Sequence, residues 1–208
     1  MEAATTMNQV TLKGILVGMI LGDGYLDKIQ GGGNSRIHIN HSAKYQNYIK
    51  WKKDILDQIT STQLVPYKAE AQGKKYDMLS LRSKRHPIYR RLREEMYRLG
   101  HKTATSKIMK DLTWEGIVVW FCDDGYFDRH SAHIFTHNFS ESENYLMREW
   151  LKKKFNLDCK VYRRRQYYYL RFTVDSSKKI KEWMIKLNCG MNYKIDSDEL
   201  PRKGDDIV

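Results

Sequence analysis

The sequence predicts an α+β protein built from two related halves, each with the element order α-β-β-α-β-β-α. Three observations support this prediction. Residues 23–27, Asp-Gly-Tyr-Leu-Asp, return as Asp-Gly-Tyr-Phe-Asp at residues 124–128, 101 positions later. An apolar run precedes each copy, at residues 15–21 and 117–122. Further segments then match in the same order, and so long a period indicates two domains rather than a solenoid.

The correspondence extends well beyond the repeated block. Residues 36–39 and 46–49 match residues 133–136 and 143–146 at an offset of 97, and later residues match at offsets of 91 and 92. The glycine-rich residues 31–34 lengthen a loop in the first half only. We therefore expect an N-terminal half at residues 1–100, a linker at 101–112 and a C-terminal half at 113–208.

The first half is expected to contain a helix at residues 11–22, a strand at 36–41, a helix at 44–59, strands at 65–72 and 76–83, and a helix at 87–97. Thr11 can cap the first helix, and Gly24 can end it. Alternation predicts the first strand, and apolar residues at helical spacing predict the second helix. A turn at Gly73 joins the later strands, and Pro87 suits the first turn of the last helix.

The second half repeats this order. Its elements are expected as a helix at residues 113–122, a strand at 133–139, a helix at 141–155, strands at 159–165 and 167–175, and a helix at 177–187. The linker at 101–112 lacks a long flexible tract, so the two halves are expected to pack together.

The charge of the chain indicates a polyanionic partner. Lysine and arginine number 37 against 25 acidic residues, a formal net charge of +12. This excess suits a nucleic acid better than a small neutral substrate, although a solvated basic surface is the alternative explanation.

Cysteine usage and hydropathy exclude several other classes. Cys122, Cys159 and Cys189 are dispersed, so no zinc-binding pattern is present, and unpaired thiols fit a reducing compartment. No run approaches the roughly 18 apolar residues that a membrane span needs. The first six residues include an early acid and lack the character of a targeting segment.

Two carboxylates are the first candidate catalytic groups. If the two apolar helices pack side by side, their ends bring Asp23 and Asp124 to one place. Gly14, Gly18 and Gly22 are spaced four apart, which opens one helix face for close backbone approach. Neighbouring carboxylates repel each other and favour a hard cation between them. A divalent metal held in this way can act on a phosphate group.

The predicted strand faces provide the second set of candidates. In the strand from Tyr167, residues 168, 170, 172 and 174 are expected to face the core, which leaves Tyr169 and Arg171 on the open face. In the first half, residues 68, 70 and 72 are expected to share a face with Met78, Ser80 and Arg82. Such a polar ribbon can meet phosphates and base edges in the major groove. Any half-exposed antiparallel sheet also alternates, but the arginine run at 163–165 beside tyrosines favours DNA contact.

Ten side chains are expected to contact DNA from these faces: Arg36, His38, Lys68, Gln72, Arg82, Lys160, Tyr162, Arg164, Tyr169 and Arg171.

The two helix ends also resemble a known motif. Residues 16–24, LVGMILGDG, and residues 117–125, IVVWFCDDG, resemble the nine-residue LAGLIDADG motif. Two copies in one chain look like the single-chain, pseudo-twofold homing endonucleases encoded by mobile introns and inteins, and the second copy looks especially like the intron-encoded yeast mitochondrial type. The resemblance covers nearly the whole chain. It departs from internal symmetry at Val119, which stands where the first helix has Gly18, and at Asp123, which replaces Gly22.

The resemblance implies an arrangement and a set of roles. The two motif helices would form the domain interface, and the antiparallel sheets would form a DNA-binding saddle. Asp23 and Asp124 would be the metal-binding acids, and the backbone carbonyls of Gly22 and Asp123 would add metal ligands.

Two further pairs of residues are candidates at this site. Lys102 and Lys194 match the family's lysine near the active site, where a cation can polarise the water network or stabilise charge on the phosphate. Asn40 and His137 are expected at equivalent strand positions, where they would hold water beside the metal.

The implied activity is that of a site-specific DNA endonuclease. It would act as a monomer on double-stranded DNA, without a membrane or protein partner, and make a staggered double-strand break in a long asymmetric target. The cofactor would be Mg²⁺, with Mn²⁺ as a substitute and Ca²⁺ supporting binding without efficient cleavage. An RNA-binding intron maturase and a non-cleaving DNA-binding regulator are the alternatives. Loss of an acid would favour either, and both Asp23 and Asp124 are present.

Overall fold

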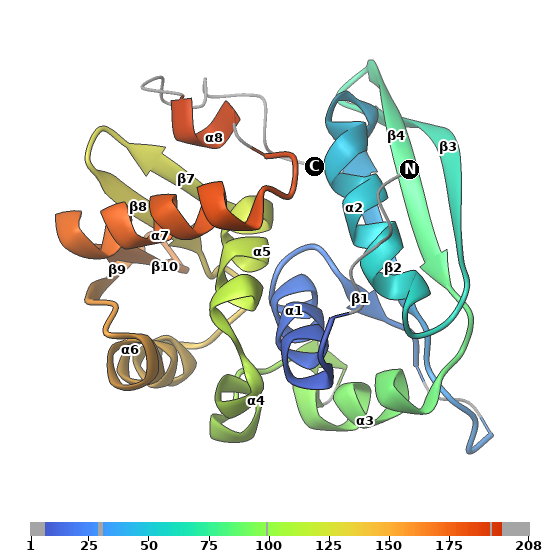
Figure 1. The fold of residues 1–208 in the computed structure, drawn as a ribbon, viewed down its shortest axis with the longest axis horizontal. Helices are drawn as coiled ribbons and strands as arrows, with labels where there is room; N and C mark the ends of the chain where they lie inside the picture. The colour runs from blue at the N-terminus through green and yellow to red at the C-terminus, as the bar shows by residue number, and fades with distance from the viewer. Residues whose placement is uncertain (1–6, 29–30, 99, 192, 197–208) are drawn as a thin grey trace.

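The computed structural model describes residues 7–28, 31–98, 100–191 and 193–196, and it has the predicted α+β architecture in two halves (Figure 1). The first half consists of α1 (Gln9–Leu21), β1 (Tyr25–Leu26), β2 (Ile37–Ser42), α2 (Gln46–Asp57), β3 (Thr62–Ala71), β4 (Lys74–Ser83) and α3 (Pro87–Met96). The second half consists of α5 (Trp114–Asp124), β7 (Gly125–Asp128), β8 (Ser131–Phe135), α6 (Glu141–Phe155), β9 (Cys159–Arg164), β10 (Tyr167–Phe172) and α7 (Val174–Leu187). The predicted order α-β-β-α-β-β-α is confirmed in both halves, and β1 and β7 are the short first strands to which the prediction assigned no residues.

Each half folds its strands into one antiparallel sheet. The strand orders are β1-β2-β4-β3 and β7-β8-β10-β9, which are the same order repeated. Helices α1 and α5 lie side by side between the two sheets, as Figure 1 shows. The two motif helices therefore form the interface between the halves.

Glycines allow the backbones of α1 and α5 to touch. A Cβ atom on Gly18 would lie 2.1 Å from the carbonyl oxygen of Gly116, and a Cβ on Gly116 would lie 2.1 Å from that of Gly14. Gly18 thus opposes Gly116 rather than Val119. Every residue from 14 to 21 is buried, which explains why this helix is apolar all round rather than along one stripe.

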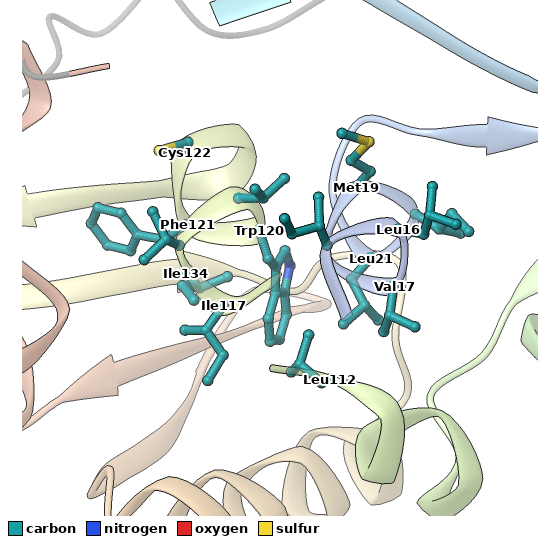
Figure 2. Packing of buried hydrophobic residues seen from close by; sticks show 14 of the residues in the cluster. Leu16, Val17, Met19, Leu21, Leu112, Ile117, Trp120, Phe121, Cys122 and Ile134 are labelled. Atoms are coloured by element: carbon teal, nitrogen blue, oxygen red, sulfur yellow. The ribbon is translucent and has the colours of Figure 1, made fainter. Parts of the chain in front are cut away.

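The core continues across this interface. Trp120 is completely buried, and Figure 2 shows its side chain on the side of α5 that faces α1. Buried apolar residues of both halves belong to one cluster, so the interface is a continuous apolar core and not a hydrated boundary between two domains.

Several element boundaries differ from the prediction. Asn8, and not Thr11, caps α1, because its side-chain oxygen accepts a hydrogen bond of 2.8 Å from the Thr11 N–H. Thr173 caps α7, so the strand before it ends at Phe172 and Val174 does not face the core. Both helices therefore begin directly after a residue whose side-chain oxygen accepts a hydrogen bond from a free N–H group of the first turn. The apolar pattern of the sequence did not indicate these positions.

The segment between the halves is also more ordered than the term linker suggested. It contains β6 (His101–Lys102), which pairs with β5 (Tyr97–Arg98) at the end of the first half, and the helix α4 (Ser106–Asp111), which Thr105 caps. A 3₁₀ turn (Ala43–Tyr45) and the short α8 (Tyr193–Asp196) complete the described elements.

Strand pairing corrects the sequence correspondence between the halves. Tyr25 pairs with His38, whereas Tyr126 pairs with His133. The structural offset between β2 and β8 is therefore 95 residues rather than 97. A shift of two residues keeps every side chain on the same face of the sheet, so alternation alone did not reveal it.

Candidate active site and DNA-contacting face

The two predicted acids lie at the ends of the packed helices. Burial among protein atoms raises the pKa of Asp23 to about 6, and the nearby Asp123 carboxylate adds to the effect. Asp23 nevertheless remains accessible to solvent. Burial likewise raises the pKa of Asp124 to about 8, with further contributions from the charges of Asp23 and Asp123. The site therefore concentrates negative charge that a cation would relieve.

Asp123 makes contacts that the sequence did not predict. Its Oδ1 accepts hydrogen bonds from Lys52 Nζ at 2.6 Å and from the Tyr48 hydroxyl at 2.8 Å. The Lys52 and Asp123 side chains have no solvent exposure. Its Oδ2 accepts a 3.3 Å hydrogen bond from the Asp23 N–H. A Cβ on Gly22 would lie 2.5 Å from this oxygen, so the Asp123 carboxylate occupies the space above Gly22.

The two predicted lysines reach the helix ends. Lys102 Nζ donates a 2.6 Å hydrogen bond to the carbonyl oxygen of Gly22, and Lys194 Nζ donates a 2.7 Å hydrogen bond to that of Gly125. Burial lowers the pKa of Lys102, although the three neighbouring aspartates oppose this shift. The arrangement is not symmetric, because one lysine binds the carbonyl before the acid and the other binds the carbonyl after it.

His41 is a third unpredicted residue at this site. Asp23, His41 and Asp123 each place a possible metal-ligand atom within 4.8 Å of the others. Burial lowers the pKa of His41 to about 4, and the positive charge of Lys52 adds to this, so the imidazole is neutral near pH 7. The His41 ring packs edge-on against the Tyr48 ring at 5.4 Å.

The sequence did contain signals for these residues. His41 follows Ile37 and Ile39 in steps of two, on what should be an apolar strand face. Lys52 stands four positions after Tyr48 on the buried face of α2. A polar residue in an apolar periodicity predicts a buried partner, because burying an unpaired charge is costly.

An open pocket of ≈ 360 Å³ adjoins the first acid. Its lining residues are Asp23, Tyr25, Asp27, His38 and Asn40. Among these lining residues, Asp27 pairs with Arg36 at 2.9 Å and with His38 at 2.8 Å. Asn40 lines the same pocket as Asp23, and its role beside the metal stays a prediction.

The predicted equivalence of Asn40 and His137 is wrong. Asn40 pairs with Ser80 in β4, and the residue in the matching register of the second half is Phe135, which pairs with Tyr169. His137 follows β8, and its ring lies 4.9 Å from that of Phe135. It packs within an aromatic group on the sheet, and a role beside the metal remains only a prediction.

The open face of the second sheet agrees with the prediction. The residues that pair across β9 and β10 on this face are Tyr169 with Tyr162, Arg171 with Lys160, and Tyr167 with Arg164. Directly opposite residues share a face of an antiparallel sheet, so these side chains form one surface.

The corresponding prediction for the first sheet is partly wrong. Ser80 lies opposite Val65 and Arg82 lies opposite Gln63, whereas Lys68 lies opposite Asp77. Lys68 therefore does not share a face with Arg82. Gln72 follows β3 in the hairpin turn with φ +52°, where it belongs to neither strand face. β3 begins at Thr62, and its pairing with β4 places its odd-numbered side chains on the same face as Ser80 and Arg82. Contact of Lys68 and Gln72 with DNA stays a prediction.

Stacked rings cross the open face of the second sheet. They are Tyr126 and His133 at 4.7 Å, His133 and Tyr169 at 5.8 Å, and Tyr169 and Tyr162 at 5.5 Å between centroids. The matching positions of the first sheet hold Tyr25, His38, Ser80 and Val65. The two open faces therefore present different chemistry.

Within the described residues, no helix combines the length and apolar character needed to cross a bilayer.

Comparison with known proteins relates this geometry to a family. Residues 13–180 match the LAGLIDADG DNA endonuclease family. An uncharacterized protein of Methanocaldococcus jannaschii is 25% identical over 164 residues, which make up 77% of this chain and 63% of that protein. The RecA protein of Mycobacterium gastri is 29% identical over 119 residues, or 56% of this chain and 27% of that protein. The chain thus spans less than two thirds of the length of either relative.

Solved structures share the fold. The homing endonuclease I-WcaI bound to its DNA recognition sequence has a TM-score of 0.76 and 21% identity, covering 92% of this chain and 88% of its own. I-DmoI in complex with DNA and Mn has a TM-score of 0.52 and 17% identity, covering 93% of this chain and 100% of its own. The fold, the two motif helices and the family match over most of the sequence agree, and the chain therefore belongs to the LAGLIDADG DNA endonuclease family.

Proposed function

We propose that this protein is a site-specific endonuclease that hydrolyses both strands of a long asymmetric DNA duplex with a stagger, using a divalent metal. The observation that carries the proposal is the position of Asp23 and Asp124. They lie at the ends of two helices whose backbones touch, one acid from each half, and Asp23 shares a pocket with His38 and Asn40 of the first sheet. Such a pair suits a reaction in which both strands are cut near one centre.

The donor set fits a hard divalent cation. Asp23 and Asp124 offer carboxylate oxygens, and the backbone carbonyls of Gly22 and Asp123 belong to the same helix ends. Oxygen ligands of this kind suit Mg²⁺ and Mn²⁺. When bound, the ion would activate water and stabilise the leaving oxygen. Solved structures of I-DmoI contain DNA with Mn or with Ca, which supports the use of a divalent ion here.

Lys102 and Lys194 supply positive charge at this centre. Each is partly buried and is already oriented by a backbone carbonyl. A cation fixed in this way can stabilise negative charge that develops on the phosphate without reorganising during the reaction. We therefore assign both lysines to the chemical step and not to base recognition.

Double-stranded DNA is the proposed substrate. The net charge of +12 favours a polyanion, and I-WcaI and I-DmoI both form complexes with DNA. Each half contributes one acid and one sheet, so a single chain completes the site. We expect one protein per target in sedimentation, and two chains per site would contradict this.

The deciding experiment begins with selection of cleaved sites from a randomised duplex library in Mg²⁺. The selected duplex should be cut on both strands in Mg²⁺ and in Mn²⁺, bound but hardly cut in Ca²⁺, and left intact after metal removal. Asp54→Asn is the matched control for the variants Asp23→Asn and Asp124→Asn, because Asp54 is an exposed acid on α2. Binding without cleavage in any metal would favour a regulator, and preferential binding of intron RNA would favour a maturase.

A further inference from the structure

The two motif helices differ at the residue before the acid. The first helix has Gly22 at this position, and the second has Asp123. The Asp123 carboxylate extends across the interface and accepts a hydrogen bond from the Asp23 N–H at 3.3 Å. Gly22 has no side chain with which to make the reciprocal contact to Asp124. Among the residues that the structure describes, a side-chain hydrogen bond from the opposite half therefore reaches the backbone of Asp23 and has no counterpart at Asp124.

Helix α2 supports this contact from behind. Lys52 and Tyr48 lie one helical turn apart, and both donate to Asp123 Oδ1, at 2.6 and 2.8 Å. The Lys52 ammonium also lies 4.4 Å from the centre of the Tyr48 ring. The Lys52 and Asp123 side chains are fully buried, so each charge depends on the other.

This pairing leaves the Asp123 side chain little freedom to act as a metal ligand. Oδ1 already faces an ammonium group, and Oδ2 is engaged by a backbone amide. Lys52 therefore already supplies a positive charge beside Asp23, His41 and Asp123, the three residues whose side chains could otherwise hold a metal ion. The side chain of Asp123 instead contacts the backbone of Asp23 on the opposite motif helix.

We propose that Lys52 and Asp123 are positioning residues that hold the backbone of Asp23 and so make the two halves of the active site catalytically unequal. The inference rests on the proposed nuclease function. Because the contact is made to Asp23 and has no counterpart at Asp124, its loss should slow the cleavage of the two DNA strands by different factors.

The test uses the full chain and the selected target duplex, labelled separately on each strand. Lys52→Met keeps the length of the side chain and removes its charge. Asp123→Ala combined with Lys52→Met removes the whole pair without leaving a buried charge. Lys53→Met is the matched control, because Lys53 is a partly exposed neighbour that pairs with Asp57.

Three measurements are made on each variant: the single-turnover rate for each strand in Mg²⁺, the dissociation constant in Ca²⁺ and the melting temperature. Lys52→Met should lower the melting temperature and slow one strand about tenfold more than the other, a difference of ~1.4 kcal/mol in barrier height. The double variant should regain stability but keep the ratio of strand rates that Lys52→Met shows, which differs from the wild-type ratio. Binding in Ca²⁺ should stay within about threefold of the wild type, since neither residue lies on an open sheet face.

The outcomes separate the two claims. A wild-type protein that cuts no target would overturn the proposed function and this inference with it. A wild type that cuts, with Lys52→Met slowing both strands equally or not at all, would overturn the inference alone. Recovery of the wild-type ratio of strand rates in the double variant would also overturn it, because the pair would then serve only stability.

Discussion

Lys102 Nζ donates a hydrogen bond of 2.6 Å to the carbonyl oxygen of Gly22, although 80 positions separate the two residues in the chain. The carbonyl belongs to the residue immediately before the first acid. A residue of the segment between the halves thus binds the end of α1, and its amine is kept near the proposed catalytic centre.

Lys102→Ala should slow cleavage without changing which bases the protein prefers. Loss of one preorganised cation or donor at a reacting centre costs about 10²–10³-fold in rate. The single-turnover rate should fall by this order, while the cleavage profile on single-base variants of the target keeps its shape. Lys107→Ala is the control, because Lys107 is exposed and pairs only with Glu95 at the surface. A changed base preference in Lys102→Ala would contradict the assignment.

Asp23→Asn and Asp124→Asn should each abolish double-strand cleavage and leave target binding largely intact. Asparagine preserves the shape of the side chain but removes the charge that would hold a cation. We expect a loss of about 10³-fold or more in the rate. Gel shifts in Ca²⁺ measure binding, and Mg²⁺ reactions measure cutting. Near-normal cutting by either variant would show that its acid is not a metal ligand.

Metal affinity should rise with pH between about 6 and 8. The raised pKa values of Asp23, to about 6, and of Asp124, to about 8, mean that protons compete with the cation in this window. Each proton displaced strengthens binding by up to about tenfold per pH unit. Calorimetric titration of Mg²⁺ or Mn²⁺ at several pH values measures this. The Asp124→Asn variant should show a flatter dependence, and an identical slope would argue against the assignment.

The same shift predicts an effect on stability. The folded pKa of Asp124 lies above its unfolded value, so the folded state binds more protons than the unfolded state between about pH 4 and 8. The free energy of unfolding therefore falls as pH rises through this range. In the absence of divalent metal, Asp124→Asn should melt at a higher temperature than the wild type at pH 8. A lower melting temperature would contradict this sign.

Arg171→Ala should relax base preference at one position of the target. Arg171 lies on the open face of the second sheet, opposite Lys160. A bidentate contact to guanine is worth roughly 1–3 kcal/mol of discrimination. Arg163→Ala is the control, because Arg163 alternates onto the other face of β9. Equal weakening on every single-base variant of the target would identify Arg171 as a phosphate contact.

Gly18→Ala should destabilise the protein strongly. The added Cβ would lie 2.1 Å from the Gly116 carbonyl oxygen, so α1 and α5 would have to move apart. Overpacking of this kind costs about 3 kcal/mol, or more where backbone is involved. Denaturant unfolding measures the loss. Val10→Ala, at an exposed position of α1, should change stability by less than about 0.5 kcal/mol. Similar midpoints for the two variants would contradict the close helix contact.

The amino-acid sequence by itself determined the architecture of this protein and its two principal acids. The Asp-Gly-Tyr repeat, the apolar runs before it and the alternation of the strands are all local in the chain. They predicted the order of elements in each half and the packing of α1 against α5. The open face of β9 and β10 followed in the same way, because period-two alternation is a local property.

Only the tertiary structure decided how the halves correspond and what surrounds the acids. The two-residue difference between β2 and β8 leaves the faces unchanged, so it became visible only when Tyr25 and Tyr126 could be matched to their partners across the sheets. The face of β3 depended on its pairing with β4.

The contacts of Asp123 with Lys52 and Tyr48 join residues more than 70 positions apart. No periodicity in the sequence specifies which buried cation meets which buried carboxylate. The pairing forms when the two halves pack, because a buried charge without a partner would lower the free energy of unfolding by several kcal/mol.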